Sequence, residues 1–276
     1  ELAGKNSVWI YAAEWITVVN NSDITSSTNA LNIIALYIGG NLTFISKGAI
    51  SLSGGKYGIG IYVESGTGIN STLGKITLNR TTRTMVGMVS KGAGALVENQ
   101  GTITAKSNLG MYIAGTSIGI NKGKITATTG TGVYIEGSGN SFDGTGGTIE
   151  SKAVGIYLKD TTAGTVTNTG TLDIASGGVG VFGENANIDF NVNVTGTGAV
   201  GVAASSNSVI SGNVTTGENS VGVYVLDNSV SFNGANITTE KKAPGGTSIG
   251  ILLNSAVGSY TMSNVIVSAQ DGVGIY

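Results

Sequence analysis

A short strand-like signature recurs along the whole chain and constrains its fold more than any other feature. It consists of an aliphatic residue, usually Gly, a second aliphatic residue and usually Tyr, as in Val154-Gly155-Ile156-Tyr157. Clear copies start at Ile59, Leu109, Thr131, Val154, Val179, Val221 and Val273, weaker ones at Val86, Val200 and Ile249, and copies without the Gly at Val8 and Ile34. The mean period is roughly 24 residues, and repeats of about 20 to 50 residues are typical of solenoids.

A second pattern falls between successive copies and completes one repeat. It is a turn containing Asn or Gly followed by Ile-Thr, as in Gly123-Lys124-Ile125-Thr126, and a brief third strand such as Thr165-Val166-Thr167 lies between the two patterns. Three short strands separated by Gly, Asn and Ser turns form one coil. Leucine-rich repeats and propeller blades do not fit, because the first need a helix or a Leu/Asn consensus and the second need about 40 residues.

These patterns predict an all-β fold, a right-handed parallel β-helix. We expect about 11–12 coils of roughly 24 residues, with three short strands per coil. Residues 1–276 then form a single β-helical segment, which we expect to be an excerpt of a longer chain because the last signature ends in mid-strand at Tyr276.

The period of two in a strand predicts which side chains face the core. In the segment 154–159, Val154, Ile156 and Leu158 are predicted to face inward. Gly155, Tyr157 and Lys159 are predicted to face solvent. The aliphatic residue after the signature Gly is apolar in every copy, so we expect it to form a core ladder with the Tyr column outside.

The composition excludes several kinds of chemistry. The chain has no Cys and no His, so nucleophilic catalysis by a His-based triad and metal binding by Cys or His are ruled out. Its formal net charge is −2 with basic residues scattered, which argues against a nucleic-acid partner. We therefore predict that the chain is not an enzyme and has no cofactor and no metal site.

Charged residues are expected to balance one another on the surface. Glu136, Lys159 and Glu184 fall at the same position of adjacent coils, as do Glu64 and Lys91, which predicts a ladder of compensated charges. The carboxylates are not expected to stack into the converging pair that glycoside hydrolysis needs. The loop 143–147 is similar to a calcium-binding turn, but such turns work in tandem copies and this one occurs once.

Threonine recurs at the position after the aliphatic residue of the second pattern and is predicted to face outward. The copies are Thr77, Thr104, Thr126, Thr195, Thr215 and Thr238. Lysines interrupt the neighbouring outward column, which argues against an ice-binding surface. Thr favours strands, and its hydroxyl is at home on a solvated face, so the column needs no ligand to explain it.

The outward Tyr column is the best candidate for a ligand or partner surface. It is densest at Tyr112, Tyr134 and Tyr157, which lie on three consecutive coils. Stacked rings on adjacent coils also stabilise the fold and cover the bare backbone of Gly. The structural and functional interpretations are compatible, and an exposed aromatic column is able to contact sugar rings or a protein.

The two patterns together resemble a known family. Val-Gly-Ile-Tyr alternating with Asn-x-Gly-x-Ile-Thr, as in 99–104 and 121–126, resembles the passenger repeats of large fusobacterial autotransporter adhesins, the RadD-like group. The resemblance is clearest over 54–276. It implies type V secretion, a passenger exposed at the cell surface, and membrane attachment through a C-terminal barrel that these residues do not include.

The function that follows is a non-catalytic adhesin segment, a rigid rod that mediates or projects attachment to host or bacterial cells. The resemblance implies a surface glycan or protein receptor as the partner, and it transfers no binding residue. Two alternatives stay open. One is a carbohydrate-active β-helix enzyme, either a polysaccharide lyase or a tailspike-like hydrolase, and the other is a purely mechanical stalk.

Overall fold

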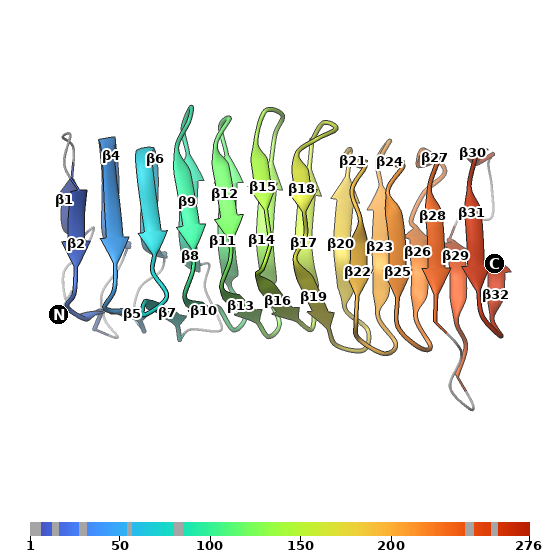
Figure 1. Ribbon diagram of the computed structural model, residues 1–276, viewed down its shortest axis with the longest axis horizontal. Helices are drawn as coiled ribbons and strands as arrows, with labels where there is room; N and C mark the ends of the chain where they lie inside the picture. The colour runs from blue at the N-terminus through green and yellow to red at the C-terminus, as the bar shows by residue number, and fades with distance from the viewer. Residues whose placement is uncertain are drawn as a thin grey trace.

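A computed structural model of the chain describes residues 7–12, 17–27, 32–53, 57–79, 85–240, 246–254 and 259–276. The described residues form strands and contain no helix. The strands stack side by side along an elongated rod that runs from the N-terminus to the C-terminus (Figure 1). Each pairing between neighbouring coils is parallel. These ranges contain no helix long and apolar enough to cross a membrane. The predicted parallel β-solenoid is confirmed.

The first face of the rod carries the signature strands, each paired with the equivalent strand of the next coil. They are β1 (Ser7–Ala12), β4 (Ile33–Ser46), β6 (Gly58–Asn70), β8 (Met85–Lys91), β11 (Leu109–Ala114), β14 (Thr131–Glu136), β17 (Val154–Lys159), β20 (Val179–Glu184), β23 (Val200–Ser205), β26 (Val221–Val225), β29 (Ile249–Leu253) and β32 (Val273–Ile275).

The second face carries the brief strands that follow them, and the far ends of β4 and β6 belong to it as well. The other strands of this face are β2 (Thr17–Asn20), β9 (Leu96–Asn99), β12 (Ile118–Asn121), β15 (Ser141–Asp143), β18 (Val166–Asn168), β21 (Asn187–Ile188), β24 (Val209–Ile210), β27 (Ser231–Asn233) and β30 (Thr261–Ser263).

The third face carries the Ile-Thr strands, which form an 11-stranded sheet. They are β3 (Ile24–Thr25), β5 (Ala49–Leu52), β7 (Lys75–Leu78), β10 (Thr102–Thr104), β13 (Lys124–Ala127), β16 (Thr148–Ser151), β19 (Thr171–Ile174), β22 (Val192–Val194), β25 (Asn213–Thr216), β28 (Asn236–Thr239) and β31 (Ile266–Ala269). The predicted outward threonines of this face are half-buried or exposed, as expected.

Two early coils differ from the predicted three short strands. β4 has 14 residues and β6 has 13, because each runs through the first and second faces without a turn. Their pairing changes register on both sides of Gly39, where a bulge bends the strand between the faces.

The core is the predicted aliphatic ladder. The residue after the signature Gly is fully buried in the inner coils, at Leu36, Ile61, Met88, Met111, Val133, Ile156, Val181, Val202, Val223 and Ile251. Ile10 is partly buried and Ile275 is 51% exposed, because the first and last described coils have a neighbouring coil on one side only.

The signature Gly faces the core, so the prediction that Gly155 faces solvent is wrong. Gly155 is buried, and a Cβ there would lie 2.7 Å from the carbonyl oxygen of Gly180 and 3.0 Å from Cδ1 of Ile174 on the third face. The strand bends toward that face at Gly155, which interrupts the alternation: Val154 and Ile156 have register partners in β20, and Gly155 has none. Val154 is consequently half-buried on the outer surface.

A ladder of buried asparagines fixes the register between coils where the second face turns into the third. The amide of Asn70 donates to Oδ1 of Asn99, and the amide of Asn99 donates to Oδ1 of Asn121, each at 2.8 Å. All three side chains are fully buried. Asn99 both donates and accepts along the rod, and the amide of Asn121 donates to the carbonyl oxygen of Thr148 at 3.5 Å, whereas Oδ1 of Asn70 at the start of the ladder has no partner among the described residues.

Candidate contact surface

The structure brings the three candidate tyrosines together on β11, β14 and β17. Tyr112 pairs in register with Tyr134, and Tyr134 with Tyr157. The ring centroids of Tyr112 and Tyr134 are 5.4 Å apart, and those of Tyr134 and Tyr157 are 4.8 Å apart. Phe182 of the next coil meets Tyr157 edge-on at 5.0 Å. All four rings are half-buried, so the predicted outward column exists and packs against itself.

The aromatic column is interrupted and consists of two blocks of adjacent rings. The other block lies in the first coils, where Tyr37 stacks between Tyr11 and Tyr62 with centroid distances of 5.2 and 5.3 Å. Val89 occupies the same position between the two blocks, and Ala203 follows Phe182; both are buried. The described residues therefore contain a first block of three consecutive rings and a second block of four, Tyr112, Tyr134, Tyr157 and Phe182.

Glutamates of the next coil accept hydrogen bonds from the tyrosine hydroxyls. Tyr112 donates to Oε2 of Glu136 at 2.5 Å, and Tyr157 donates to Oε2 of Glu184. Tyr37 donates to Glu64 in the same way in the first block. Each pair joins adjacent coils on the outer surface, because the Glu lies two residues after the aromatic position and so shares its face.

The predicted charge ladder is right in register and wrong in its interactions. Glu136, Lys159 and Glu184 are partners on adjacent strands. The two glutamates bond to tyrosines, however, and no ion pair joins either of them to Lys159 in the described part of the chain. The ion pairs lie elsewhere, between Lys122 and Glu98 at 2.8 Å and between Lys124 and Glu150 at 2.5 Å.

Burial and the glutamates keep the tyrosines neutral. Desolvation raises the pKa of Tyr112 and of Tyr157, and the hydrogen bonds to Glu136 and Glu184 raise both further. The hydrogen bond to Glu64 is the largest cause that raises the pKa of Tyr37 to about 12. Desolvation also raises the pKa of Tyr134. The hydroxyls of Tyr37, Tyr112 and Tyr157 are therefore held as hydrogen-bond donors to carboxylates.

The arrangement presents ring edges to the solvent. Tyr134 lies between the rings of Tyr112 and Tyr157, so a sugar ring has no free face of Tyr134 on which to stack. Beside the rings, the first residues of the same strands form a half-buried outward column. We call these two columns together the contact strip: Leu109, Thr131, Val154, Tyr112, Tyr134 and Tyr157.

The outward aliphatic column could not be predicted from alternation alone. Alternation places Leu109 and Val154 in the core, and the inward turn of the signature Gly moves them to the surface. The residue before the signature Gly is apolar in most copies, although the residue after the Gly already fills the core. This surplus apolar position was the available signal in the sequence. A strip with aliphatic and aromatic edges and an acidic rim is suited to contact with another protein.

A pair of carboxylates stacks on the third face, contrary to the prediction that none would. Glu150 of β16 and Asp173 of β19 are partners in register. They line an open hollow of about 320 Å³ together with Lys152. The Glu150 carboxylate is already engaged by Lys124 and accepts a hydrogen bond from Oγ1 of Thr126 at 3.2 Å. This pairing offsets the repulsion expected between like charges at neighbouring positions.

The loop 143–147 uses its carboxylate locally. Oδ1 of Asp143 accepts hydrogen bonds from the backbone N–H of Thr145 at 2.9 Å and from its hydroxyl at 2.6 Å. This is an Asx-type turn, in which the Asp143 carboxylate accepts hydrogen bonds within its own loop. Among the described residues, no three His, Cys, Asp or Glu side chains gather in a way that could hold a metal ion.

Comparison with known proteins gives one partial match. A family model described as the BigA third pectate lyase-like domain matches residues 1–108. The matched part includes the first aromatic block and ends before the contact strip. No curated protein and no solved structure matches the chain. The match agrees with the β-helix and is consistent with a bacterial surface protein.

Proposed function

We propose that this chain is a non-catalytic segment of a bacterial cell-surface adhesin, a rigid β-helical rod that presents the contact strip to a protein on another cell. The observation that carries the proposal is the alignment of two outward columns, one aromatic and one containing Leu109, Thr131 and Val154, on the three consecutive strands β11, β14 and β17. Support for the cellular setting comes from the BigA family model and from the resemblance to type V autotransporter passengers of the RadD-like group.

The chemistry of the strip favours a protein partner. The stacked rings offer edges, and Leu109 and Val154 add aliphatic surface beside them. Apolar and aromatic groups of this kind form the buried centres of protein interfaces. Glu136 and Glu184 hold two of the three hydroxyls in place, so little side-chain entropy would be lost when a partner binds.

A binding assay on whole cells tests the proposal. The purified, labelled chain is compared with a Leu109→Lys/Val154→Lys variant, which places charges on the strip and leaves the tyrosine stack intact. The control is Thr215→Lys/Thr238→Lys, because these outward residues are partners on adjacent coils of the third face. We expect the strip variant to lose most cell binding and the control to retain it, with equal thermal stability.

Other outcomes of the assay separate the alternatives. If both variants bind cells like the unaltered chain, the strip is not the contact surface. If the unaltered chain binds neither bacterial nor host cells, the segment is a mechanical stalk. Cell binding that is abolished both by glycosidase treatment and by Leu109→Lys/Val154→Lys identifies a glycan, in place of a protein, as the receptor of the contact strip.

The enzymatic alternative rests on the hollow that contains Glu150 and Asp173. The family match gives it no support at these residues, because it ends at residue 108. The bonds of Glu150 to Lys124 and Thr126 further reduce its availability as an acid or base. We expect no new reducing ends and no unsaturated products from a panel of bacterial and host polysaccharides. Turnover that disappears in Glu150→Gln and Asp173→Asn would establish the enzyme instead.

A further inference from the structure

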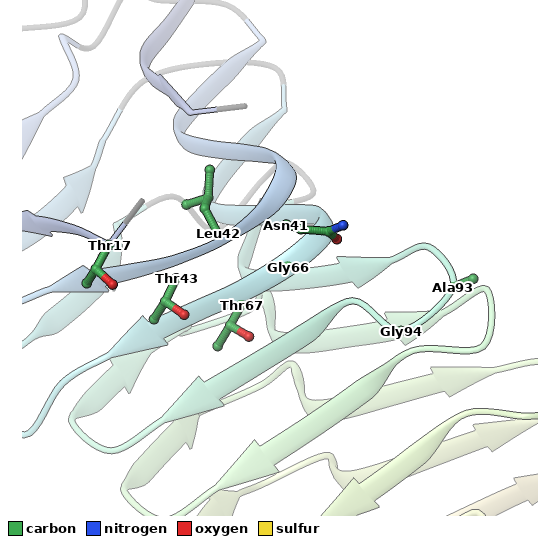
Figure 2. A pocket seen from close by; sticks show the side chains of 8 residues that line it. All are labelled: Thr17, Asn41, Leu42, Thr43, Gly66, Thr67, Ala93 and Gly94. Carbon is green, nitrogen blue, oxygen red and sulfur yellow. The ribbon is translucent and has the colours of Figure 1, made fainter. Parts of the chain in front are cut away.

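A second hollow lies on the second face of the first coils, away from the contact strip. Its volume is about 500 Å³, and its lining has no charged side chain. Figure 2 shows three threonine side chains in a row on neighbouring strands, with Asn41 on the bend to one side and Ala93 on a loop beyond. We call it the threonine hollow; it is lined by Thr17, Asn41, Leu42, Thr43, Gly66, Thr67, Ala93 and Gly94.

The floor of the threonine hollow is a ladder of hydroxyl groups. Thr17 of β2 pairs in register with Thr43 of β4, and Thr43 pairs with Thr67 of β6. Neighbouring strands are about 4.8 Å apart, so the hydroxyls repeat at that spacing along the rod. Thr17 is exposed, and the other two are half-buried. Within the residues that the structure describes, none of these hydroxyls has a hydrogen-bond partner.

One wall of the hollow is built by an irregularity of the chain. The bulge around Asn41 and Leu42 leaves the pairing of β4 with β6 and rises beside the threonines. It rests on Gly66, whose φ is +82° and whose Cβ, if present, would lie 2.5 Å from the carbonyl oxygen of Leu42. Bulges of this kind often re-aim side chains next to functional sites. Ala93 and Gly94 of a neighbouring loop complete the lining.

The chemistry of the lining selects one class of ligand. An anionic ligand would need Lys or Arg, and a cation would need carboxylates, and the lining holds neither. Hydroxyl groups and the Asn41 amide donate and accept hydrogen bonds. A neutral, linear molecule whose groups donate and accept hydrogen bonds at regular intervals is complementary to this floor.

We propose that the threonine hollow binds a neutral oligosaccharide, which lies along the rod and hydrogen-bonds to Thr17, Thr43, Thr67 and Asn41. The site is independent of the contact strip, which lies on other strands and takes a protein. The rod would then carry two kinds of contact, one to protein and one to a neutral glycan.

The test measures binding of defined sugars to the full chain. Cellotetraose and maltotetraose are the neutral probes, and tetragalacturonate is the anionic probe, followed by saturation-transfer NMR and calorimetric titration. The variant Thr43→Val/Thr67→Val removes two hydroxyls and keeps the β-branched shape. Its matched control is Thr77→Val/Thr104→Val, a half-buried pair on adjacent coils of the third face.

We expect saturable binding of at least one neutral tetrasaccharide, and binding about tenfold weaker in Thr43→Val/Thr67→Val, because two hydrogen bonds are lost. The control and Leu109→Lys/Val154→Lys should bind the sugar like the unaltered chain, so that failure here is distinct from failure of the contact strip. Equal affinity in Thr43→Val/Thr67→Val, preference for tetragalacturonate, or no binding of either neutral probe overturns the proposal.

Discussion

Gly110 and Ile125 face each other across the core at a distance that leaves no room for a side chain on Gly110. A Cβ on Gly110 would lie 2.5 Å from Cγ2 of Ile125 and 2.5 Å from the carbonyl oxygen of Gly132 in the next coil. The pattern that ends in Tyr and the pattern that ends in Ile-Thr therefore contact each other in the core. Because Ile125 of the third face occupies the space beside Gly110, the first face has room only for a glycine there.

Substitution of the signature Gly by Ala should destabilise the rod. We expect Gly110→Ala to lower the free energy of unfolding by about 1 to 3 kcal/mol, because the methyl group forces the two faces apart in a packed core. Chemical denaturation measures the change. Gly274→Ala is the control: it lies at the same position of the signature, nothing lies within 4 Å of its Cβ position, and little loss is expected. Equal losses in both variants would contradict the close contact.

The tyrosine hydroxyls should differ in their contribution to stability. Tyr112→Phe leaves the carboxylate of Glu136 without its donor, and we expect a loss of about 1 kcal/mol. Tyr134→Phe should be nearly neutral, since the Tyr134 hydroxyl has no hydrogen-bond partner among the described residues. Thermal unfolding of the two variants provides the comparison, and both keep the aromatic stack. A larger loss in Tyr134→Phe than in Tyr112→Phe would contradict a stabilising role for the hydrogen bond to Glu136.

Stability should fall at alkaline pH. A tyrosine in an unfolded chain has a pKa of about 10. The pKa values of Tyr37, Tyr112 and Tyr157 are raised in the fold, that of Tyr37 to about 12, so the folded state holds these protons more tightly. Their stabilisation is complete below pH about 10 and is lost as pH rises through the folded-state values.

Urea unfolding followed at several pH values, with tyrosinate absorbance recorded in parallel, measures this dependence. The triple variant Tyr37→Phe/Tyr112→Phe/Tyr157→Phe should show a flatter decline above pH about 10, because it lacks the three groups whose pKa is raised most. A decline of equal slope in the triple variant would assign the alkaline sensitivity to other residues.

The buried asparagine ladder should matter more than the exposed one. Asn99→Ala removes the middle amide of Asn70, Asn99 and Asn121 and leaves buried partners unpaired, so we expect a loss of about 2 to 4 kcal/mol. Asn213→Ala removes the middle of an equivalent ladder in solvent, between Asn191 and Asn236, and should cost under about 1 kcal/mol. Denaturant midpoints of the two variants test the difference. Similar losses would show that burial does not govern the ladder.

The sequence by itself determined the coil and its outer and inner columns. The repeat of the signature predicts the solenoid, and the period of two that follows the Gly correctly places Ile156 inside and Tyr157 outside. Equivalent positions of neighbouring signatures also come into register as expected, which brings Tyr112, Tyr134 and Tyr157 together. These features depend on the local geometry of a strand and on a repeat that is visible in the amino-acid sequence.

Only the tertiary structure decided where the signature Gly points, what the glutamates bind and where the hollows lie. Gly155 turns inward because the strand must bend toward Ile174 of another face. Glu136 bonds to a tyrosine of the preceding coil, although the sequence offers Lys159 in the following one. The threonine hollow depends on a bulge that leaves the pairing at Gly39. Each of these follows from contacts between different faces or different coils, and the alternation within one strand carries no information about such contacts.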